Sequence, residues 1–529
     1  MKREGTSEKG DGILRTEWRT LLWMAIVALA TVLTFHEGMN YELLSDWDDV
    51  SFVVINPHIT LSWKNFFFYL LHPFQDLFSP LPMWSLMVDR ALWGVKPLGY
   101  HLHNLLLHIL AAWTLMAMLR KMGIRLALAG LGALLWALNP QKVESVIWIS
   151  ERKDVLCGLF AFLSMWLFLE HRWGWCALCT VLAIFAKPAA LVLPCFYVVW
   201  IWGRGEKLLR REVVVPTAVG LCAVIWSIVV TKQTNPGTVE TSLMVPLHNL
   251  FWYPLTSLVP FETNPFYPEV ITLDTRTFVV MVAGMTLLVV GIVLAWRLKC
   301  PWRGILAGLA LIGGTMLPVL GLLRYTNFRY CDRYNYLVSA AVIGILCLLL
   351  ELSFRRWMIP RLHHVLLVLL AVGVVGYASA AYLYVPYWAN CVKLSYYGLQ
   401  QPGRPNLQAY VMGIMAGFRM DAYEYLDYLR RELPQRPPLT HYDAETSVQT
   451  MLLFMDAHQH FQKGDYQTAE ECYQRLIKTM AQGNVGNGQV KVALPPPLIA
   501  WIHEDLASIA EQQGDEVKAI FYREAMKSQ

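Results

Sequence analysis

Three acidic residues follow the first apolar segment of the chain, in the run Asp46-Trp47-Asp48-Asp49. Acidic side chains beside a bilayer are costly unless they are solvated or have a function. One interpretation is a solvated loop end, or an N-cap for a helix on the membrane surface. The other is a general base, because group transfer to a hydroxyl needs a carboxylate that accepts the hydroxyl proton. The residue types alone leave both interpretations open.

A second polar segment, rich in charges of both signs, lies between two apolar runs. Lys142 and Arg152 are suited to hold an anionic phosphate. Glu144, Glu151 and Asp154 are suited to position an acceptor, or to bind a cation through oxygen ligands. Salt bridges that keep a short loop soluble explain the same composition equally well.

Two further basic features precede or interrupt apolar runs. Arg329 and Arg333 lie in a short cluster with Arg324 and Asp332, and arginine favours bidentate contact with phosphate. Lys187 stands before a proline at the end of a short apolar run. Its side chain either extends to the membrane interface or faces a lipid phosphate.

Four polar residues lie near the start of one predicted helix: His101, His103, Asn104 and His108. Their spacing favours packing and interfacial positions over a metal site. We predict no resident metal from these residues, and leave open a divalent cation at the acidic cluster around Glu144, Glu151 and Asp154.

The elements that must position these residues follow from the apolar pattern. The chain has 529 residues, of which 56% are hydrophobic and 16% are charged, whereas soluble domains carry about 25% charged residues. Residues 1–385 account for this low proportion of charged residues. The sequence therefore predicts an all-α membrane domain and a smaller soluble domain, and the absence of a basic tract with interleaved aromatic residues excludes nucleic-acid binding. About eleven spans are expected, near residues 20–36, 101–119, 124–139, 154–170, 173–186, 189–203, 213–231, 277–296, 304–322, 335–353 and 362–384.

The orientation of these spans follows from the basic residues, which gather in every second loop. The N-terminal residues 1–19 and the other basic loops are predicted to be cytoplasmic. The first apolar run is predicted to be a retained span rather than a cleaved signal. The long loop 37–100, the other candidate residues and the C-terminal domain are then external, and loop 37–100 is expected to contain helices on the membrane surface.

The C-terminal region 391–529 has a different pattern. Gly464 and Gly514 are each followed by Asp and by small and aromatic residues at helical spacing. This pattern is typical of tetratricopeptide-like helix pairs, with a Gly- and Pro-rich insertion at 482–497 and a third pair at 405–432. A generic helical bundle is the alternative.

Five motifs in order resemble those of TMTC-type protein O-mannosyltransferases and their bacterial relatives. They are Asp48-Asp49 with Asn56-Pro57; Ser79-Pro80 through Gly99-Tyr100-His101 to His108; Val143-Glu144-Ser145 with Ser150-Glu151-Arg152-Lys153-Asp154; Lys187-Pro188; and Asp332-Arg333-Tyr334. The resemblance covers roughly residues 20–390, and the C-terminal repeats follow the domain order of the family.

This resemblance implies a GT-C membrane domain over residues 20–390, which uses a polyprenyl- or dolichyl-phosphate sugar and inverts the anomeric centre. It implies that Asp48, with Asp49 beside it, is the catalytic acid pair of the first external loop. The remaining roles that it implies are acceptor binding by Glu144, Glu151, Asp154 and His101, and donor-phosphate binding by Lys187, Arg329, Arg333, Lys142 and Arg152.

The expected reaction is transfer of a mannose-like hexose to an external acceptor, in particular a protein Ser or Thr hydroxyl. The repeat domain is expected to bind the protein acceptor or a partner. The expected location is a bacterial inner membrane with a periplasmic site, or the ER membrane with a lumenal site in a eukaryote. The alternatives are a non-enzymatic membrane scaffold that presents the repeats, and a GT-C enzyme that modifies a lipid or polysaccharide.

Overall fold

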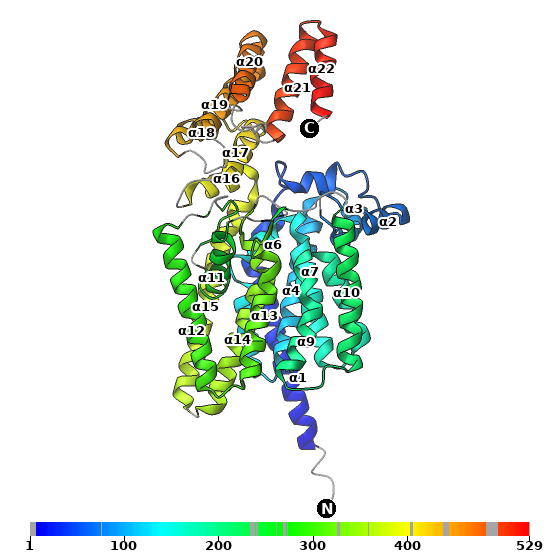
Figure 1. Cartoon of the computed structure of the whole chain (residues 1–529), viewed down its shortest axis with the longest axis vertical. Coiled ribbons are helices and arrows are strands. Elements are labelled where there is room, and N and C mark those ends of the chain that lie inside the picture. Colours follow the sequence, from blue (N-terminus) through cyan, green and yellow to red (C-terminus); the bar gives the residue numbers. More distant parts are fainter. Residues whose placement is uncertain are drawn as a thin grey trace, which may run out of the picture. The chain divides into compact units, whose positions relative to one another are not determined.

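The computed structural model describes residues 7–75, 77–232, 238–239, 242–260, 262–267, 271, 273–324, 328–357, 359–401, 406–436, 444–482 and 496–527. The chain divides into two compact units. The first contains Met1–Pro265 and Ile271–Asn390, and the second contains Phe266–Val270 and Cys391–Gln529. Both units are built from helices (Figure 1).

The first unit is a helical bundle with one very short pair of strands. Its α-helices are α1 Ser7–Phe35, α2 Trp63–Leu71, α3 Pro80–Trp93, α4 Pro97–Lys121, α5 Leu126–Ala137, α6 Lys142–Ile147, α7 Arg152–Leu169, α8 Trp173–Ala186, α9 Leu193–Gly203, α10 Arg211–Thr231, α11 Met244–Leu258, α12 Thr275–Arg297, α13 Trp302–Met316, α14 Asn335–Arg356 and α15 Pro360–Tyr384. Short helical turns are η1 His36–Asn40, η2 Val50–Val54, η3 Ile149–Glu151, η4 Pro188–Val192, η5 Leu317–Val319, η6 Asp332–Tyr334 and η7 Val385–Ala389. Strands β1 Thr238–Val239 and β2 Leu323–Arg324 pair antiparallel.

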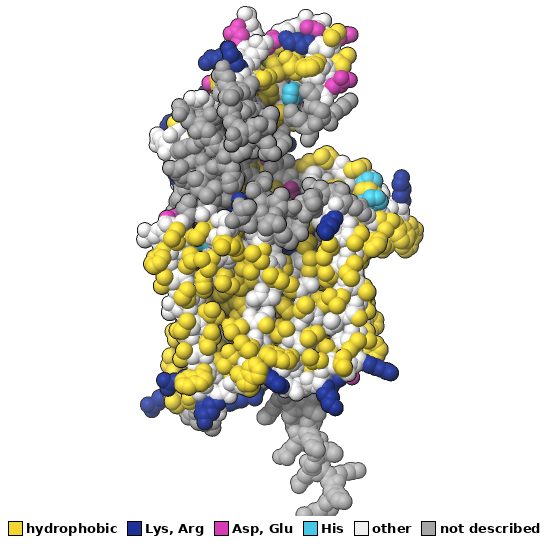
Figure 2. Space-filling model, viewed as in Figure 1, with side chains coloured by type: hydrophobic (Ala, Val, Ile, Leu, Met, Phe, Trp, Pro, Cys, Tyr) yellow, Lys and Arg dark blue, Asp and Glu magenta, His cyan; other side chains and the backbone are white. Residues whose placement is uncertain are grey.

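Each of the eleven apolar segments predicted from the sequence is helical. In the described part of the chain, seven helices are long and apolar enough to cross a membrane, by length and composition: those that include α1, α4, α10, α12, α13, α14 and α15. The other four are α5, α8 and α9, which have 10 to 17 residues, and α7, whose first turn is charged. Apolar side chains cover the flanks of the bundle (Figure 2). The chain is an all-α, multi-span membrane protein.

Basic side chains gather at one end of this bundle (Figure 2). Contacts there join loops that are far apart in the sequence: Arg125 pairs with Glu351 at 2.9 Å, and Lys121 pairs with Glu170 at 3.0 Å. The basic loops predicted to share one side of the membrane therefore lie at the same end of the bundle, and the polar segments that follow α5, α8 and α13 lie at the other end.

A polar core joins α4, α5 and α14 inside the bundle. His108 Nδ1 lies 2.7 Å from the Tyr336 hydroxyl, and the Trp136 indole donates to the Tyr336 carbonyl at 3.0 Å. Tyr336 also lies against Gly158 of α7, where a Cβ would come within 2.4 Å of its ring. A side chain at position 158 would therefore push α7 away from α14. These contacts fix the start of α14 relative to the start of α7, and both starts carry site residues.

The segment between α1 and α4 contains the predicted surface helices, α2 and α3. The Ser62 hydroxyl caps α2 by accepting from the Asn65 amide. Trp63 is 78% exposed and Phe67 is 51% exposed, as expected of a helix that meets the membrane surface. Helix α11 was not predicted. It lies between the predicted spans 213–231 and 277–296, where Pro246 and polar residues interrupt the apolar pattern.

The described part of the second unit contains seven helices, of which the last four form two pairs, α19 with α20 and α21 with α22. The seven are α16 Cys391–Gln400, α17 Leu407–Arg419, α18 Tyr423–Gln435, α19 Ala444–Gln462, α20 Tyr466–Gln482, α21 Pro496–Gln512 and α22 Glu516–Lys527. Gly464 and Gly514 form the turns of the last two pairs with φ of 76° and 77°. The following aspartates cap the next helices, since Asp465 accepts from Thr468 N and Asp515 accepts from Lys518 N. Most of the predicted insertion lies outside the described residues.

Candidate functional site

Asp49 anchors the loop that follows α1. One carboxylate oxygen accepts from the backbone N–H of Ser150 at 2.9 Å and from its hydroxyl at 2.5 Å. The other oxygen accepts from the Leu44 N–H at 3.1 Å. The side chain is 1% exposed, and burial raises its pKa to about 6 in spite of these hydrogen bonds. Asp49 therefore ties the first loop to η3, the turn before α7.

Asp48 differs from its neighbour because its side chain is partly exposed. Within the described residues its carboxylate accepts no hydrogen bond and forms no ion pair. Burial raises its pKa, and Glu151 adds to that effect, while Lys153 and Arg333 oppose it. Asp48 is thus a carboxylate without a bound partner among the described residues, and it lies near the charged residues Glu151, Lys153 and Arg333.

Lys187 is the centre of that group. Its Nζ lies 2.6 Å from Glu151 Oε1 and 2.6 Å from Asp154 Oδ1. Lys153 Nζ approaches the other Glu151 oxygen at 3.3 Å, and the Ser145 hydroxyl donates to Asp154 at 2.9 Å. These residues come from the starts of α6 and α7 and from the turn after α8. Although burial opposes ionisation, Lys153 and Lys187 hold the pKa of Glu151 well below its usual range.

Arg333 closes the group from the side of α14. Its backbone N–H donates to Glu144 at 3.0 Å, and its guanidinium forms an ion pair with the same carboxylate. The guanidinium also lies over the rings of Trp148 and Phe328, at 5.4 and 4.4 Å from their centroids. Burial raises the pKa of Glu144 in spite of the Arg333 charge. Aromatic faces and two carboxylates, Glu144 and, at 3.9 Å, Glu151, thus hold the guanidinium in one orientation.

The charged group contains four acids and three bases. The acids are Asp48, Glu144, Glu151 and Asp154, and the bases are Lys153, Lys187 and Arg333. Within the described residues, Asp48 is the one of these four acids that has no ion pair. Asp48 is therefore the carboxylate of this group that is available to accept a proton.

Arg152, predicted to bind phosphate, lies in a separate buried network. Its guanidinium forms an ion pair with Asp89 and donates to Asn104 at 2.7 Å and to the Tyr100 carbonyl at 2.9 Å. The side chain is fully buried. These partners occupy the guanidinium, which joins α3, α4 and α7.

Lys142 is also buried, against the first turn of α14. Its Nζ donates to the Asn335 carbonyl at 2.9 Å and to the Ser339 hydroxyl at 2.7 Å. Burial lowers its pKa to about 7, while Asp154 and Asp332 oppose the shift. Lys142 fixes the start of α14 and makes no ion pair in the described part of the structure.

The remaining predicted residues lie around this site. His101 is buried and contacts the Tyr41 carbonyl at 3.2 Å, so it packs against the loop that carries Asp48. The Arg329 carbonyl accepts from Asn249 of α11 at 3.0 Å. Among the described residues, no group of three His, Cys, Asp or Glu is placed to hold a metal ion. Glu144, Glu151 and Asp154, the carboxylates of the predicted acidic cluster, each pair with a cationic side chain.

Sequence reasoning missed Lys153, whose ammonium lies between Glu151 and the Phe52 ring. It also missed Trp47, the residue before Asp48, whose ring stacks on Trp388 at a centroid distance of 6.1 Å and meets Trp148 at 4.4 Å in a tilted arrangement. The only sequence signal for Lys153 was its place in the charged run 151–154.

Comparisons with known proteins agree with the motif resemblance. No protein-family model matches the chain. The chain is similar to Protein O-mannosyl-transferase Tmtc1 of Drosophila melanogaster, with 34% identity over 112 residues, which is 20% of this chain and 13% of that protein. It is also similar to Protein O-mannosyl-transferase TMTC2 of Mus musculus, with 30% identity over 161 residues, which is 26% of this chain and 18% of that protein. The matches thus cover less than a fifth of each relative's length, and they confirm the resemblance to TMTC-type proteins.

Among solved structures, the chain is distantly similar to ArnT from Cupriavidus metallidurans. For the apo state the TM-score is 0.40 with 16% identity, covering 74% of this chain and 82% of that chain. For the same protein bound to undecaprenyl phosphate the TM-score is 0.37, with the same identity and coverage.

Proposed function

We propose that this protein is a GT-C-type glycosyltransferase that moves a hexose from a polyprenyl- or dolichyl-phosphate to a hydroxyl group of an acceptor. The observation that carries the proposal is Asp48: a carboxylate with a raised pKa and no hydrogen bond or ion pair in the described structure, facing buried cations. The sequence likeness to proteins named protein O-mannosyl-transferases supports mannose as the sugar and a protein Ser or Thr as the acceptor.

In the proposed reaction, the acceptor hydroxyl attacks the anomeric carbon of the lipid-linked sugar. The bond from that carbon to the phosphate oxygen breaks, and the lipid phosphate leaves with the bonding electrons. The hydroxyl proton passes to Asp48. The leaving group is already an activated phosphate, so the protein has to orient the reactants, stabilise the phosphate charge and accept one proton.

Lys153 and Arg333 are the cations best placed to receive the donor phosphate. Both act on the charge of Asp48, and both lie over the Trp148 ring. An anionic phosphate bound to them would raise the pKa of Asp48 further and make it a stronger base. Lys187 would act indirectly, because it neutralises Glu151 and Asp154 and so leaves Lys153 and Arg333 more positive towards the donor.

The site belongs on the external face of the membrane. The basic loops occupy the opposite end of the bundle, and positively charged loops favour the cytoplasmic side. In a bacterium the site would face the periplasm, and in a eukaryotic cell it would face the ER lumen.

The test is a transfer assay with purified full-length protein in lipid nanodiscs. Labelled polyprenyl-phosphate mannose and polyprenyl-phosphate glucose serve as donors, and a Ser/Thr-rich peptide serves as the acceptor. We expect the wild type to transfer label and Asp48→Asn to lose activity by about 10²- to 10⁴-fold, the usual contribution of a general base. Glu42→Gln changes an exposed acid in the same loop and should keep wild-type activity. Equal transfer by wild type and Asp48→Asn would exclude Asp48 as the base, and absence of transfer from every donor would refute the proposed function.

A further inference from the structure

Asp332 is a fully buried acidic residue beside the charged site, and no step of the proposed reaction uses it. It begins η6, the three-residue turn that also carries Arg333. Isolated helices shorter than about 12 residues are marginal in water, so a turn of this length does not hold itself in place. The position of η6, and with it the origin of the Arg333 side chain, therefore depends on contacts with other elements.

The Asp332 carboxylate supplies such contacts in two directions. One oxygen accepts from the side-chain amide of Gln141, just before α6, at 3.0 Å. The other oxygen accepts from the backbone N–H of Asn264, between α11 and α12, at 3.0 Å. Both partners are donors, so a carboxylate fits this position, whereas an asparagine would turn its own amide N–H groups towards one of them. These hydrogen bonds explain an acidic residue at a buried position, where a charge is otherwise costly.

Gln141 is itself held by hydrogen bonds to α14 and, through α14, to α11. Its amide oxygen accepts from the Asn335 side chain at 2.6 Å. The Asn335 amide oxygen accepts in turn from the Ser257 hydroxyl of α11 at 3.0 Å. Gln141, Asn335 and Ser257 are all fully buried. Asp332 is therefore bound to a polar network that joins α6, α11 and α14.

Arg333 follows Asp332 and leaves the turn in another direction. Successive side chains of a 3₁₀ turn point about 120° apart, so the contacts of Asp332 on one side set the direction of Arg333 on the other. The Arg333 guanidinium pairs with Glu144 and lies 3.9 Å from Glu151. Burial raises the pKa of Asp48, and Arg333 is one of two cations that oppose this rise. A rotation of η6 would therefore change the distance from this guanidinium to Asp48 and to a bound phosphate.

We propose that Asp332 is a positioning residue of the transfer reaction, which fixes η6 so that the Arg333 guanidinium stays directed at the donor phosphate. The inference rests on the proposed function, because that function assigns the phosphate to Arg333. Asp332 acts through Gln141 and Asn264 and touches neither donor nor acceptor. The exchange variant Asp332→Asn/Gln141→Glu reverses donor and acceptor in the hydrogen bond between the two residues, and it keeps an acceptor for Asn264 and for Asn335.

The experiment measures binding of farnesyl phosphate, a short polyprenyl phosphate, to the full-length protein in nanodiscs by isothermal titration calorimetry. Arg333→Gln should weaken binding about tenfold or more, as loss of a hydrogen bond to a charged group does. Asp332→Asn should weaken binding about fivefold, and the exchange variant should bind within about twofold of the wild type. In the Arg333→Gln background, Asp332→Asn should have no further effect, because its effect passes through Arg333.

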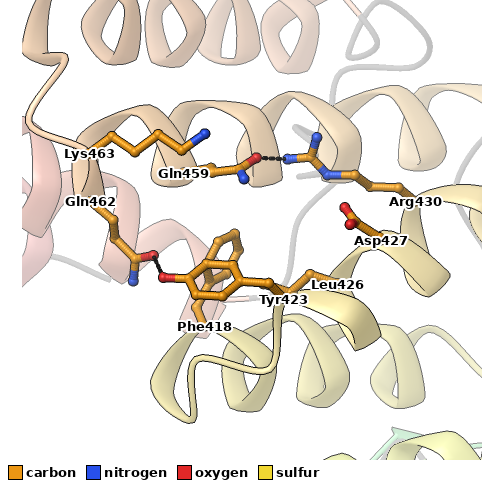
Figure 3. A pocket seen from close by; sticks show the side chains of 8 residues that line it. All are labelled: Phe418, Tyr423, Leu426, Asp427, Arg430, Gln459, Gln462 and Lys463. Carbon is orange, nitrogen blue, oxygen red and sulfur yellow. Dashed lines mark hydrogen bonds between the residues drawn. The ribbon is translucent and has the colours of Figure 1, made fainter.

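Two controls carry the same Asp→Asn substitution outside the charged group. Asp274 is an exposed N-cap of α12 that accepts from the Thr277 N–H at 2.8 Å. Asp427 is an exposed residue that lines a hollow between α18 and α19 of the second unit (Figure 3). Asp274→Asn and Asp427→Asn should both bind farnesyl phosphate as the wild type does.

The pH–rate profile of sugar transfer gives a second measurement. If Arg333 moves away from Asp48 in Asp332→Asn, a cation that opposes the raised pKa of Asp48 is lost, so the acid limb should move to higher pH. The limb should return to its wild-type position in the exchange variant. A residue that only stabilised the fold would lower the free energy of unfolding and leave the affinity of the folded protein and this limb unchanged.

Equal affinities of the wild type and Asp332→Asn for farnesyl phosphate would overturn the proposal, and so would the absence of binding by the wild type. An equal loss from Asp332→Asn in the wild-type and Arg333→Gln backgrounds would also overturn it, because Asp332 would then act independently of Arg333. Failure of the proposed function is distinguishable, because the wild type would then transfer no sugar while this pattern of farnesyl phosphate affinities persists.

Discussion

Replacing Lys187 with Met should destabilise the membrane unit strongly. Lys187 is 8% exposed and bridges Glu151 and Asp154 at 2.6 Å each. Methionine has a similar length but no charge, so the substitution leaves two buried carboxylates without this partner. Removal of one member of a buried ion pair costs about 3–5 kcal/mol, because it leaves an uncompensated buried charge.

The chain offers a matched control at the opposite end of the bundle. Lys121 pairs with Glu170 at 3.0 Å, but the side chains are 41% and 32% exposed. Lys121→Met should cost no more than about 1 kcal/mol, as for other surface pairs. The double variant Lys187→Met with Asp154→Asn should recover part of the loss, since Asp154 then carries no charge and Glu151 keeps Lys153 as a partner.

The effect of Lys187→Met on the free energy of unfolding should depend on pH, because Lys187 acts on Glu151. Its folded pKa is held below the unfolded value, so it contributes stability that is present above the unfolded pKa of about 4.3 and is lost as the pH falls through the folded pKa. Without Lys187, the pKa of Glu151 in the folded protein rises, and the stability that ionised Glu151 contributes becomes smaller. The difference in stability between wild type and Lys187→Met should therefore be largest near pH 7 and should decrease towards pH 4.

The assay is reversible unfolding of detergent-solubilised protein by increasing dodecyl sulfate, followed by tryptophan fluorescence between pH 4 and 7.5. It gives the free energy of unfolding for wild type, Lys187→Met, Lys187→Met/Asp154→Asn and Lys121→Met. If Lys187→Met costs no more than Lys121→Met, then Lys187 is not the centre of a buried ion network and the reasoning is refuted.

Three further predictions concern single residues. Because burial raises the pKa of Asp48, and the base works as the carboxylate, sugar transfer should fall on the acid side at a pH above the ordinary aspartate value of about 3.9; a pH–rate profile with its acid limb below that value would contradict this. Asp49→Ala removes the acceptor of the Leu44 and Ser150 amides, so the free energy of unfolding should fall by about 1–3 kcal/mol for each amide left unsatisfied, whereas an unchanged unfolding curve would show that the loop is held in another way. Gly464→Ala places a side chain at φ of 76° and should cost about 1–2 kcal/mol, measured by thermal unfolding of the full chain; an unchanged melting temperature would mean that the turn can rearrange.

Much of the architecture was predictable because each signal is local. Apolar runs of about 20 residues predicted the helices of the bundle. The basic residues between these runs, from Arg120 to Arg361, predicted that the loops containing them lie at the same end of the bundle. The glycine-aspartate pairs at 464 and 514 predicted the turns of the second unit, because a residue with positive φ followed by an N-cap ends one helix and starts the next. Helix α11 was missed because its prolines and polar residues interrupt the pattern on which such predictions depend.

The sequence by itself predicted that two acidic groups and several cations share the loops on one side of the membrane, but it could not assign a role to each. Asp48 and Asp49 are adjacent and chemically identical, and the structure separates them because Asp49 meets Ser150, which is 101 positions away. Arg152 and Lys153 are adjacent too, yet successive residues of a helix point about 100° apart. One therefore pairs with Asp89 in the core, while the other lies beside Glu151 and acts on Asp48. Local patterns determine which segments carry charge, and only long-range packing decides which of those charges are left without a partner.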